Sequence, residues 1–313
     1  MIFSEDQLRN FSKPLSNTEE ARCRSAIKMV ANALVSSGYI DKSINMGYDG
    51  LDKIEKRIKH KGKKYDLRLQ LQGSYANNTN IKKNSDVDIL IIQEDCFRAK
   101  YRPGVSREDY GFDSVDSKHK DLKNDIEKAL RCYFKDRIER HNKSIKIREN
   151  NYIVNTDVVP SLQYRDYSND FDFDKKNYIS GILIISDDGQ EIINYPEVHK
   201  KNGIDKNNKT HRRYKKAVRI VKKIYESMEE IEGISSYGIE CLLYNVPDNI
   251  YNSNSNKYSV IIEDIINWLL DNNQLIDDFT EVNEMRRLCE SEREKNTYIY
   301  FIKNIKDFYQ YER

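Results

Sequence analysis

The chain has 313 residues, 38% hydrophobic and 33% charged, which is enough for a two-lobed enzyme with a sizeable core and a highly charged surface. Its formal net charge of only +2 gives no global electrostatic case for a nucleic-acid-binding protein. The five cysteines are widely spaced and include no Cys-x-x-Cys pair, which argues against a disulfide framework and against a zinc site. No apolar run approaches the roughly 20 residues that span a bilayer, and the N-terminal segment has no signal-peptide pattern. We therefore expect a cytoplasmic protein without a membrane partner.

The first predicted elements are a helix and two strands. Residues 15–39 have apolar positions at helical intervals, and Ser16 and Glu19 have the spacing of a capping box. Residues 65–71 alternate between apolar and polar side chains, which is typical of a half-buried strand. A second strand is predicted over residues 86–93, which contain a continuous apolar run.

The middle of the chain continues the mixed pattern. A helix is predicted over residues 117–134, and two strands are predicted over residues 143–150 and 152–160. Because proline has no N–H group for a strand ladder, we expect the second of these strands to end at Pro160.

From about residue 209 onward the pattern becomes helical. The predicted helical segments are residues 210–228, 235–247, 260–272 and 284–309. The sequence therefore predicts an α+β lobe over residues 1–205 and a helical lobe over residues 206–313, with a cleft between them.

Two carboxylates, Asp86 and Asp88, stand at the head of the apolar run. Residues two apart on a strand face the same way, so both carboxylates project to the side that carries Leu90 and Ile92. Like charges held so close repel each other, and burying them unpaired is costly. A divalent cation resolves this conflict, because Mg²⁺ prefers oxygen ligands and often uses one or two carboxylates together with substrate phosphates.

A third carboxylate, Asp157, lies between apolar residues on a later predicted strand. If that strand runs beside the Asp86 strand, three carboxylates converge and can hold the two metal ions of an in-line displacement at phosphorus. Gly73 and Ser74 stand a short loop upstream, where glycine permits close backbone approach and the hydroxyl can donate to a phosphate. Taken singly, a Gly-Ser pair is more often an ordinary turn, and an Asp-x-Asp pair is more often a solvated strand end. The occurrence of the Gly-Ser pair, the Asp-x-Asp pair and the distant Asp157 together favours a site for phosphoryl chemistry.

These motifs resemble the nucleotidyltransferase superfamily of DNA polymerase β. The chain is most similar to the bacterial cGAS/DncV-like nucleotidyltransferases (CD-NTases), in the segments 72–91, 154–165, 193–203, 212–224 and 235–248. The resemblance implies an α+β fold, namely a polymerase-β-like lobe with a mixed sheet, packed against a C-terminal helical lobe with the active site in the cleft. It also implies synthesis of a cyclic di- or trinucleotide second messenger from NTPs, with two Mg²⁺ ions (Mn²⁺ being the alternative), in the CBASS anti-phage defence.

The resemblance also assigns roles to individual residues. By this likeness Asp86, Asp88 and Asp157 are the catalytic metal ligands, and Gly73 and Ser74 hold the donor triphosphate. The other implied nucleotide-binding residues are Lys222 (or the adjacent Lys223), Ser236 and, beside a nucleobase, Asn194. From the residues alone these three positions have ordinary alternatives, namely an exposed helix lysine, a helix N-cap and a turn residue.

The implied substrates are NTPs, and UTP is expected among them because the Asn194 amide offers the acceptor and donors that uracil can pair with. The animal DNA sensor of the superfamily binds DNA with a zinc element made of His and Cys ligands. Cys241, His199 and His211 do not have the spacing of such ligands, so no DNA partner is expected. The product is expected to act on a downstream effector. Two alternatives are a template-independent RNA nucleotidyltransferase, which a strong basic excess would favour, and a catalytically inactive nucleotide-binding module, against which the intact acidic triad argues.

Overall fold

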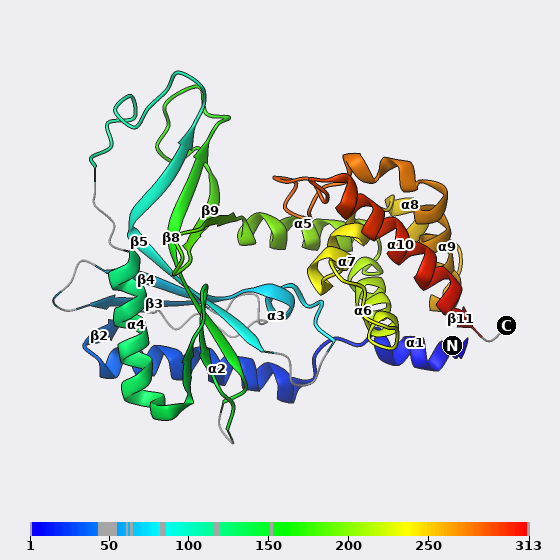
Figure 1. Ribbon diagram of the computed structural model, residues 1–313, viewed down its shortest axis with the longest axis horizontal. Helices are drawn as coiled ribbons and strands as arrows, with labels where there is room; N and C mark the ends of the chain where they lie inside the picture. The colour runs from blue at the N-terminus through cyan, green and yellow to red at the C-terminus, as the bar shows by residue number, and fades with distance from the viewer. Residues whose placement is uncertain are drawn as a thin grey trace. The chain divides into compact units, whose positions relative to one another are not determined.

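The structure is a computed structural model that describes residues 2–42, 55–60, 62, 65–81, 86–114, 119–150 and 153–311. Its contacts divide the chain into two compact units (Figure 1). The sheet unit consists of Ser16–Ala76 and Lys83–Glu197, and the helical unit consists of Met1–Leu15, Asn77–Lys82 and Val198–Arg313. The units interleave along the chain, a feature that the predicted division into residues 1–205 and 206–313 did not include. That division stays a prediction about domains, as does the cleft between the two lobes.

In the described part of the sheet unit, nine strands form a mixed sheet that is the framework of the unit. Its strands are β2 (Tyr39–Asp41), β3 (Glu55–His60), β4 (Asp66–Leu71), β5 (Val87–Tyr101), β6 (Ile138–Arg140), β7 (Ile145–Ile147), β8 (Thr156–Tyr167), β9 (Ile179–Ile185) and β10 (Glu191–Asn194). The order is β10-β9-β8-β5-β4-β3-β2, and the β6–β7 hairpin joins through β7 to β8. Strands β5 and β8 are parallel, while the other described pairs are antiparallel.

The centre of this sheet is apolar on both faces. Residues 89–92 of β5 are all fully buried, as expected for a strand with neighbours on both edges and cover on both sides. On one face, Leu90 and Ile92 form a small cluster with Ile182 and Ile184 of β9. Because side chains alternate along a strand, this is also the face that carries Asp86 and Asp88.

Two strands are longer than predicted. Strand β5 continues to Tyr101 after an irregularity between Gln93 and Phe97, and β8 continues through Pro160 to Tyr167. The prediction that Pro160 ends its strand is therefore wrong. On the edge of β8 away from β5, the pairing with β7 stops at Val158 and the pairing with β9 starts at Leu162. Pro160 lies in the gap between these two partners, where a missing N–H breaks no ladder on that edge.

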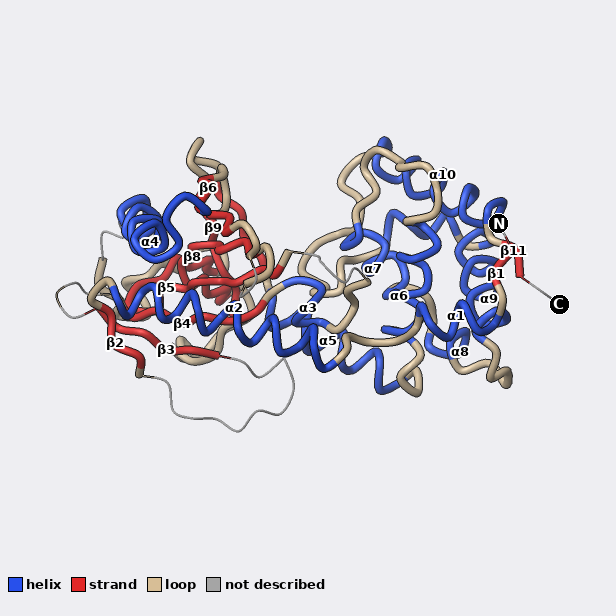
Figure 2. Tube along the Cα trace, turned by 90° about the horizontal axis from the view of Figure 1, so that it is seen from below, coloured by secondary structure: helices blue, strands red, loops and turns tan. Residues whose placement is uncertain are grey.

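Helices complete the sheet unit: α2 (Asn17–Ser36), α3 (Gly73–Asn77), α4 (His119–Phe134) and the 3₁₀ turn η2 (Lys135–Arg137). Helix α2 has the predicted capping box, in which the Ser16 and Glu19 side chains each accept from the backbone of the other residue. Helix α2 packs against α4 and against β2, β3, β4 and β5, so the pair covers the sheet from one side (Figure 2). Helix α3 begins at the Gly-Ser pair.

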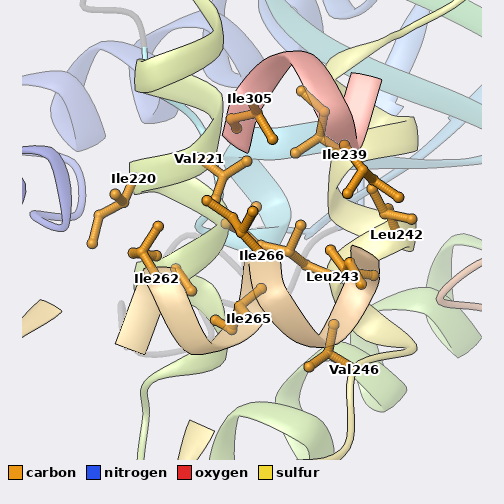
Figure 3. Close-up of a cluster of buried hydrophobic side chains, with 14 of the residues drawn as sticks. Ile220, Val221, Ile239, Leu242, Leu243, Val246, Ile262, Ile265, Ile266 and Ile305 are labelled. Carbon is orange, nitrogen blue, oxygen red and sulfur yellow. The ribbon is translucent and has the colours of Figure 1, made fainter. Parts of the chain in front are cut away.

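The helical unit is built from α1 (Glu5–Phe11), α5 (Pro196–Lys209), α6 (Tyr214–Tyr225), α7 (Ser236–Tyr244), α8 (Asp248–Tyr251), α9 (Tyr258–Asp271), η3 (Asn273–Asp278) and α10 (Glu292–Phe308). Its core contains aliphatic and aromatic side chains, and a large aliphatic part of it lies where α6, α7, α9 and α10 meet (Figure 3). The helix predicted over residues 284–309 begins only at Glu292, because Ser291 and Glu294 form a capping box there. Among the described helices, none has the length and apolar character that crossing a bilayer requires.

Both ends of the chain belong to the helical unit. Strand β1 (Ile2–Phe3) pairs in parallel with β11 (Gln310–Tyr311). The Glu5 carboxylate accepts from the backbone N–H groups of Tyr258 (2.7 Å) and Ser259 (3.0 Å), and so caps the first turn of α9. The first residues of the chain thus complete an element that lies about 250 residues further along.

Candidate active site

The three predicted carboxylates lie at the same end of two parallel strands. Asp88 of β5 is the direct neighbour of Asp157 of β8 in the parallel register. Asp86 immediately precedes β5 and lies two residues before Asp88, on the same face. The pairing that the sequence analysis assumed is therefore present in the structure, and it gathers the three carboxylates.

The electrostatics of Asp88 show that this carboxylate, taken by itself, lacks a compensating positive charge. Burial, and after it the charges of Asp157 and Asp86, raise the pKa of Asp88 to about 7. A divalent cation would remove this penalty, because hard cations take carboxylate oxygens as ligands. Three carboxylates at the same end of two neighbouring central strands are therefore a suitable set of ligands for Mg²⁺ or Mn²⁺.

Gly73 is required by the position of Asp88. Its φ of +70° lies in the left-handed region, and a Cβ atom at this position would overlap Oδ2 of Asp88. The adjacent Gln72 N–H donates to the backbone oxygen of Asp88 at 2.9 Å, so the backbone before α3 lies against the start of β5. Ser74 follows as the second residue of α3. The Gly-Ser pair and the acidic pair, twelve to fifteen residues apart, are thus parts of one site.

The sequence analysis did not identify two further polar residues of this site. Both lie at the β6–β7 hairpin: the Nζ atom of Lys146 lies 2.7 Å from Oδ2 of Asp86, and the Ser144 hydroxyl donates to Oδ1 of Asp157 at 3.4 Å. Lys146 is also the direct neighbour of Asp157 in the β7–β8 register. The alternation of Ser144 and Lys146 with isoleucines shows that they share one face of a strand, but the sequence does not reveal which strand lies next to it.

A cavity of about 360 Å³ adjoins the carboxylates on the side of this hairpin. It is lined by His141, Asn142, Lys143, Ser144, Lys146 and Asp157. Within the described ranges of the chain, no group of three or more His, Cys, Asp and Glu side chains is arranged around one metal position. Asp86 and Asp157 instead each have a polar contact from the hairpin.

The other predicted nucleotide-binding residues are distributed over both units. Asn194 is the last residue of β10 in the sheet unit and pairs with Ile182 of β9. Lys222 of α6 and Ser236, the first residue of α7, belong to the helical unit. The helix cap of α7 is Ser235, whose hydroxyl accepts from Gly238 N–H at 2.9 Å, so Ser236 is not the N-cap. The roles of Asn194, Lys222 and Ser236 in nucleotide binding stay predictions.

Lys222 is not the exposed helix lysine of the ordinary alternative. Its side chain is only 2% exposed, and its Nζ lies 3.1 Å from Oε2 of Glu240. Glu240 also accepts from the Thr79 hydroxyl (2.6 Å) and contacts Nε2 of His199 (2.9 Å). Burial alone would raise the pKa of Glu240, but the Lys222 ammonium and these partners outweigh burial and hold that pKa well below its usual range. We call this group of Lys222, Glu240, Thr79 and His199 the Glu240 cluster.

The Glu240 cluster fixes the segment that follows the Gly-Ser helix. Thr79 belongs to the short segment Asn77–Lys82, which the contacts assign to the helical unit. Besides Thr79, the backbone oxygen of Asn78 in this segment accepts from the Arg219 guanidinium of α6 at 2.5 Å. The chain therefore leaves the Gly-Ser helix directly into a segment held by buried ionic contacts.

Comparison with known protein families agrees with this geometry. Residues 51–161 match the model of a nucleotidyltransferase domain, and residues 201–310 match that of the cGAS/DncV-like nucleotidyltransferase C-terminal helical domain. The cyclic GMP-AMP synthase CdnE03 of Staphylococcus schleiferi is 40% identical to the chain over 318 aligned residues, which cover 99% of this chain and 98% of that protein.

Solved structures give the same picture. The CdnE cyclic dinucleotide synthase of Elizabethkingia meningoseptica, solved with GTP and Apcpp, has a TM-score of 0.72 and 31% identity, and the match covers 98% of both chains. The CdnE c-UMP-AMP synthase of Rhodothermus marinus, solved with Apcpp and Upnpp, has a TM-score of 0.75 and 26% identity over 97% of this chain and 95% of that one. The predicted fold, a mixed-sheet nucleotidyltransferase lobe followed by a helical lobe, is confirmed by these likenesses. By these matches the chain is a nucleotidyltransferase, and it belongs to the family of cGAS/DncV-like nucleotidyltransferases.

Proposed function

We propose that this protein joins NTPs into a cyclic dinucleotide second messenger. The observation that supports this most directly is the register that sets Asp88 beside Asp157, with Asp86 on the same face and Gly73 against Asp88. The three relatives described above, each named as a synthase of cyclic dinucleotides, support the class of product. A cyclic trinucleotide is the alternative product.

In the proposed reaction the chain's own residues position two nucleotides and accept a proton. Asp86, Asp88 and Asp157 would hold divalent cations, Mg²⁺ or Mn²⁺, which supply charge stabilisation at the transferring phosphoryl group. Gly73 lets the backbone approach the donor triphosphate, and the Ser74 hydroxyl donates to it. A ribose hydroxyl of the acceptor attacks the α-phosphorus, pyrophosphate leaves, and the hydroxyl proton passes to a carboxylate oxygen of Asp157. A second transfer within the linear product closes the ring.

Product analysis tests this proposal. The protein is incubated with four NTPs and Mg²⁺, the mixture is treated with phosphatase, and the products are separated and identified by mass spectrometry. We expect a phosphatase-resistant product in which every phosphate is internal, and no such product from Asp88→Asn. Products that phosphatase degrades completely, or extension of an added RNA, would contradict the proposal, and the second result would indicate an RNA nucleotidyltransferase instead.

We propose further that UTP is among the substrates and that Asn194 reads the uracil. Uridine use occurs within the family, because the R. marinus relative is named a c-UMP-AMP synthase. We expect labelled UTP to enter the product of the wild type and to be replaced in part by other bases in Asn194→Ser, because a hydroxyl is shorter and less discriminating than an amide. A purine-only product, such as that named for the S. schleiferi relative, would contradict the uridine proposal. An unchanged uridine content in Asn194→Ser would contradict the role of Asn194 alone.

We place this activity in the cytoplasm, in a CBASS-type anti-phage defence where the product acts on a downstream effector. What supports this is the family to which the chain belongs. Cells that carry the gene with its neighbouring genes are expected to survive phage challenge, and cells that carry Asp88→Asn are expected not to. Equal survival of both would contradict the defence role without affecting the proposed chemistry.

A further inference from the structure

Three neighbouring strands place charged residues in a row across one face of the sheet. The registers set Asp88 of β5 beside Asp157 of β8, and Asp157 beside Lys146 of β7. Residues directly opposite each other on paired strands project to the same face. The face at this end of the sheet therefore carries three carboxylates, with Asp86 as the third, and one lysine.

The lysine side chain spans a whole strand to reach its partner. Neighbouring strands lie about 4.8 Å apart, so the backbones of β7 and β5 are about 10 Å apart, with β8 between them. The Nζ atom of Lys146 nevertheless lies 2.7 Å from Oδ2 of Asp86. The side chain must therefore extend over β8 and past Asp157, and its ammonium lies among the carboxylates that the proposed function assigns to a metal ion.

We propose that Lys146 is a built-in counter-ion that occupies the cation position in the metal-free protein and is displaced when a divalent metal binds. This inference rests on the proposed metal-dependent function. Mg²⁺ requires its ligand oxygens at about 2.0–2.1 Å in near-octahedral geometry. An ammonium hydrogen-bonded to the same Asp86 oxygen cannot remain there, because the two cations would repel each other at contact distance.

The pair differs from an ordinary surface salt bridge in its burial. The side chains of Lys146 and Asp86 are 28% and 32% exposed, so most of each is removed from water. Fully exposed pairs contribute little to stability, whereas a partly buried pair within a cluster of like charges has more to gain from its partner.

The structure also offers a place for the displaced side chain. The 360 Å³ cavity beside Asp157 is lined by Lys146 itself and by uncharged or basic residues of the hairpin. On the other edge of β7, Lys146 is the direct neighbour of Glu139 of β6, a second carboxylate on its own hairpin. Lys146 therefore has a second carboxylate as its neighbour, Glu139, which also pairs with Arg148, and the open cavity lies beside it.

The test measures the Mn²⁺ affinity of the nucleotide-free protein, for the wild type and for Lys146→Gln, with electron paramagnetic resonance as the readout of free and bound Mn²⁺. Removing the competitor is expected to raise the Mn²⁺ affinity about fivefold, the equivalent of about 1 kcal/mol. The same variant is expected to melt several degrees lower than the wild type in EDTA, because three carboxylates then lack a counter-charge. The two effects have opposite signs, which a merely structural ion pair would not produce.

Two matched variants separate direct competition from a general change in charge. Lys143→Gln removes the same charge from the same hairpin at an exposed residue of the same cavity, and is expected to change the Mn²⁺ affinity less than twofold. Lys146→Arg keeps the charge and is expected to keep both the wild-type affinity and the wild-type melting temperature in EDTA. Asp88→Asn identifies the site, because it should abolish the binding that Lys146→Gln strengthens.

An unchanged or weaker Mn²⁺ affinity in Lys146→Gln, or an equal gain in Lys143→Gln, would overturn the inference. If Lys146→Gln does not fold in EDTA, melting temperatures are measured at a low and a high Mn²⁺ concentration instead, and a shift between the two no larger than that of the wild type would overturn the inference. The inference and the proposed function fail separately. A fivefold gain in Mn²⁺ affinity without any cyclic product retains the inference alone, and a cyclic product with unchanged Mn²⁺ binding retains the function alone.

Discussion

At the scale of single residues, Gly73 is the position where the smallest change should be most damaging. Gly73→Ala adds one methyl group, which must overlap the Asp88 carboxylate and also strains a backbone with a φ of +70°. We expect NTP turnover to fall at least about a hundredfold, since a metal ligand misplaced by about 1 Å has an effect of this size.

Gly104 provides a matched control for this substitution. Its φ is +79°, but a Cβ atom there would meet nothing within 4 Å. Gly104→Ala therefore has the same kind of backbone strain without the overlap, and it should lower the melting temperature while turnover stays within about twofold. An equal loss of turnover in both variants would show that backbone strain alone, and not the position of Asp88, explains the effect.

The acidic residues themselves should act as one unit. Asp88→Asn and Asp157→Asn are each expected to lower kcat by about a thousandfold or more. The kcat of the double variant is expected to be no lower than that of the less active single variant. In EDTA, Asp88→Asn should melt higher than the wild type, because a carboxylate whose pKa is raised to about 7 by burial and like charges is removed. Asp86→Asn should not share this gain, because it breaks the contact with Lys146. Multiplicative losses in the double variant would place one of the two carboxylates outside the site.

At the scale of secondary-structure elements, helix α6 presents two adjacent lysines with opposite surroundings. Lys222 is buried against Glu240. Lys223 pairs with Glu226, and the side chains of Lys223 and Glu226 are 30% and 27% exposed. Lys222→Met leaves an uncompensated carboxylate in the core and should lower the free energy of unfolding by about 3–5 kcal/mol. Lys223→Met should lower it by less than about 1 kcal/mol.

Chemical denaturation measures both values, and equal effects would contradict the account of the Glu240 cluster. The comparison also bears on the predicted contact of Lys222 with a triphosphate. Because Lys222→Met should weaken the fold in any case, a loss of activity alone does not establish phosphate binding. A rise in KM for NTP in a variant that is still folded under assay conditions is the observation that would support it.

Elements with a regular apolar pattern could be predicted from the sequence, and registers could not. The alternation before Gly73 and the run after Asp86 gave β4 and the start of β5, because each pattern is local. Lys146 was missed because its role depends on a strand pairing that joins distant parts of the chain. Helix α5 was also missed: its segment is rich in Asn and Lys, and its buried residues are His199 and Gly203 rather than a periodic apolar stripe.

At the scale of the whole molecule, the helical unit depends on segments from three parts of the chain. Removal of residues 1–12 would delete Phe3 and Leu8 from its core, and Glu5 from the first turn of α9. We expect amide hydrogen exchange to become faster throughout α6 and α9, with little change in β5 and β8, which belong to the sheet unit. The single variant Glu5→Gln should weaken the α9 cap alone, by about 1 kcal/mol. Faster exchange in β5 and β8 to the same extent would contradict the assignment of the N-terminal residues to the helical unit.

The pairing of the first strand with the last has a consequence for the way the protein is made. On the ribosome, Ile2 and Phe3 are added 308 residues before their described partners, Gln310 and Tyr311. At about 5–20 residues per second, β1 waits about 15–60 s for β11. The buried Phe3 lacks this part of its final surroundings for all of that time. A nascent chain that stops before Gln310 would therefore leave β1 unpaired, even though the described helices of the helical unit have already been synthesised.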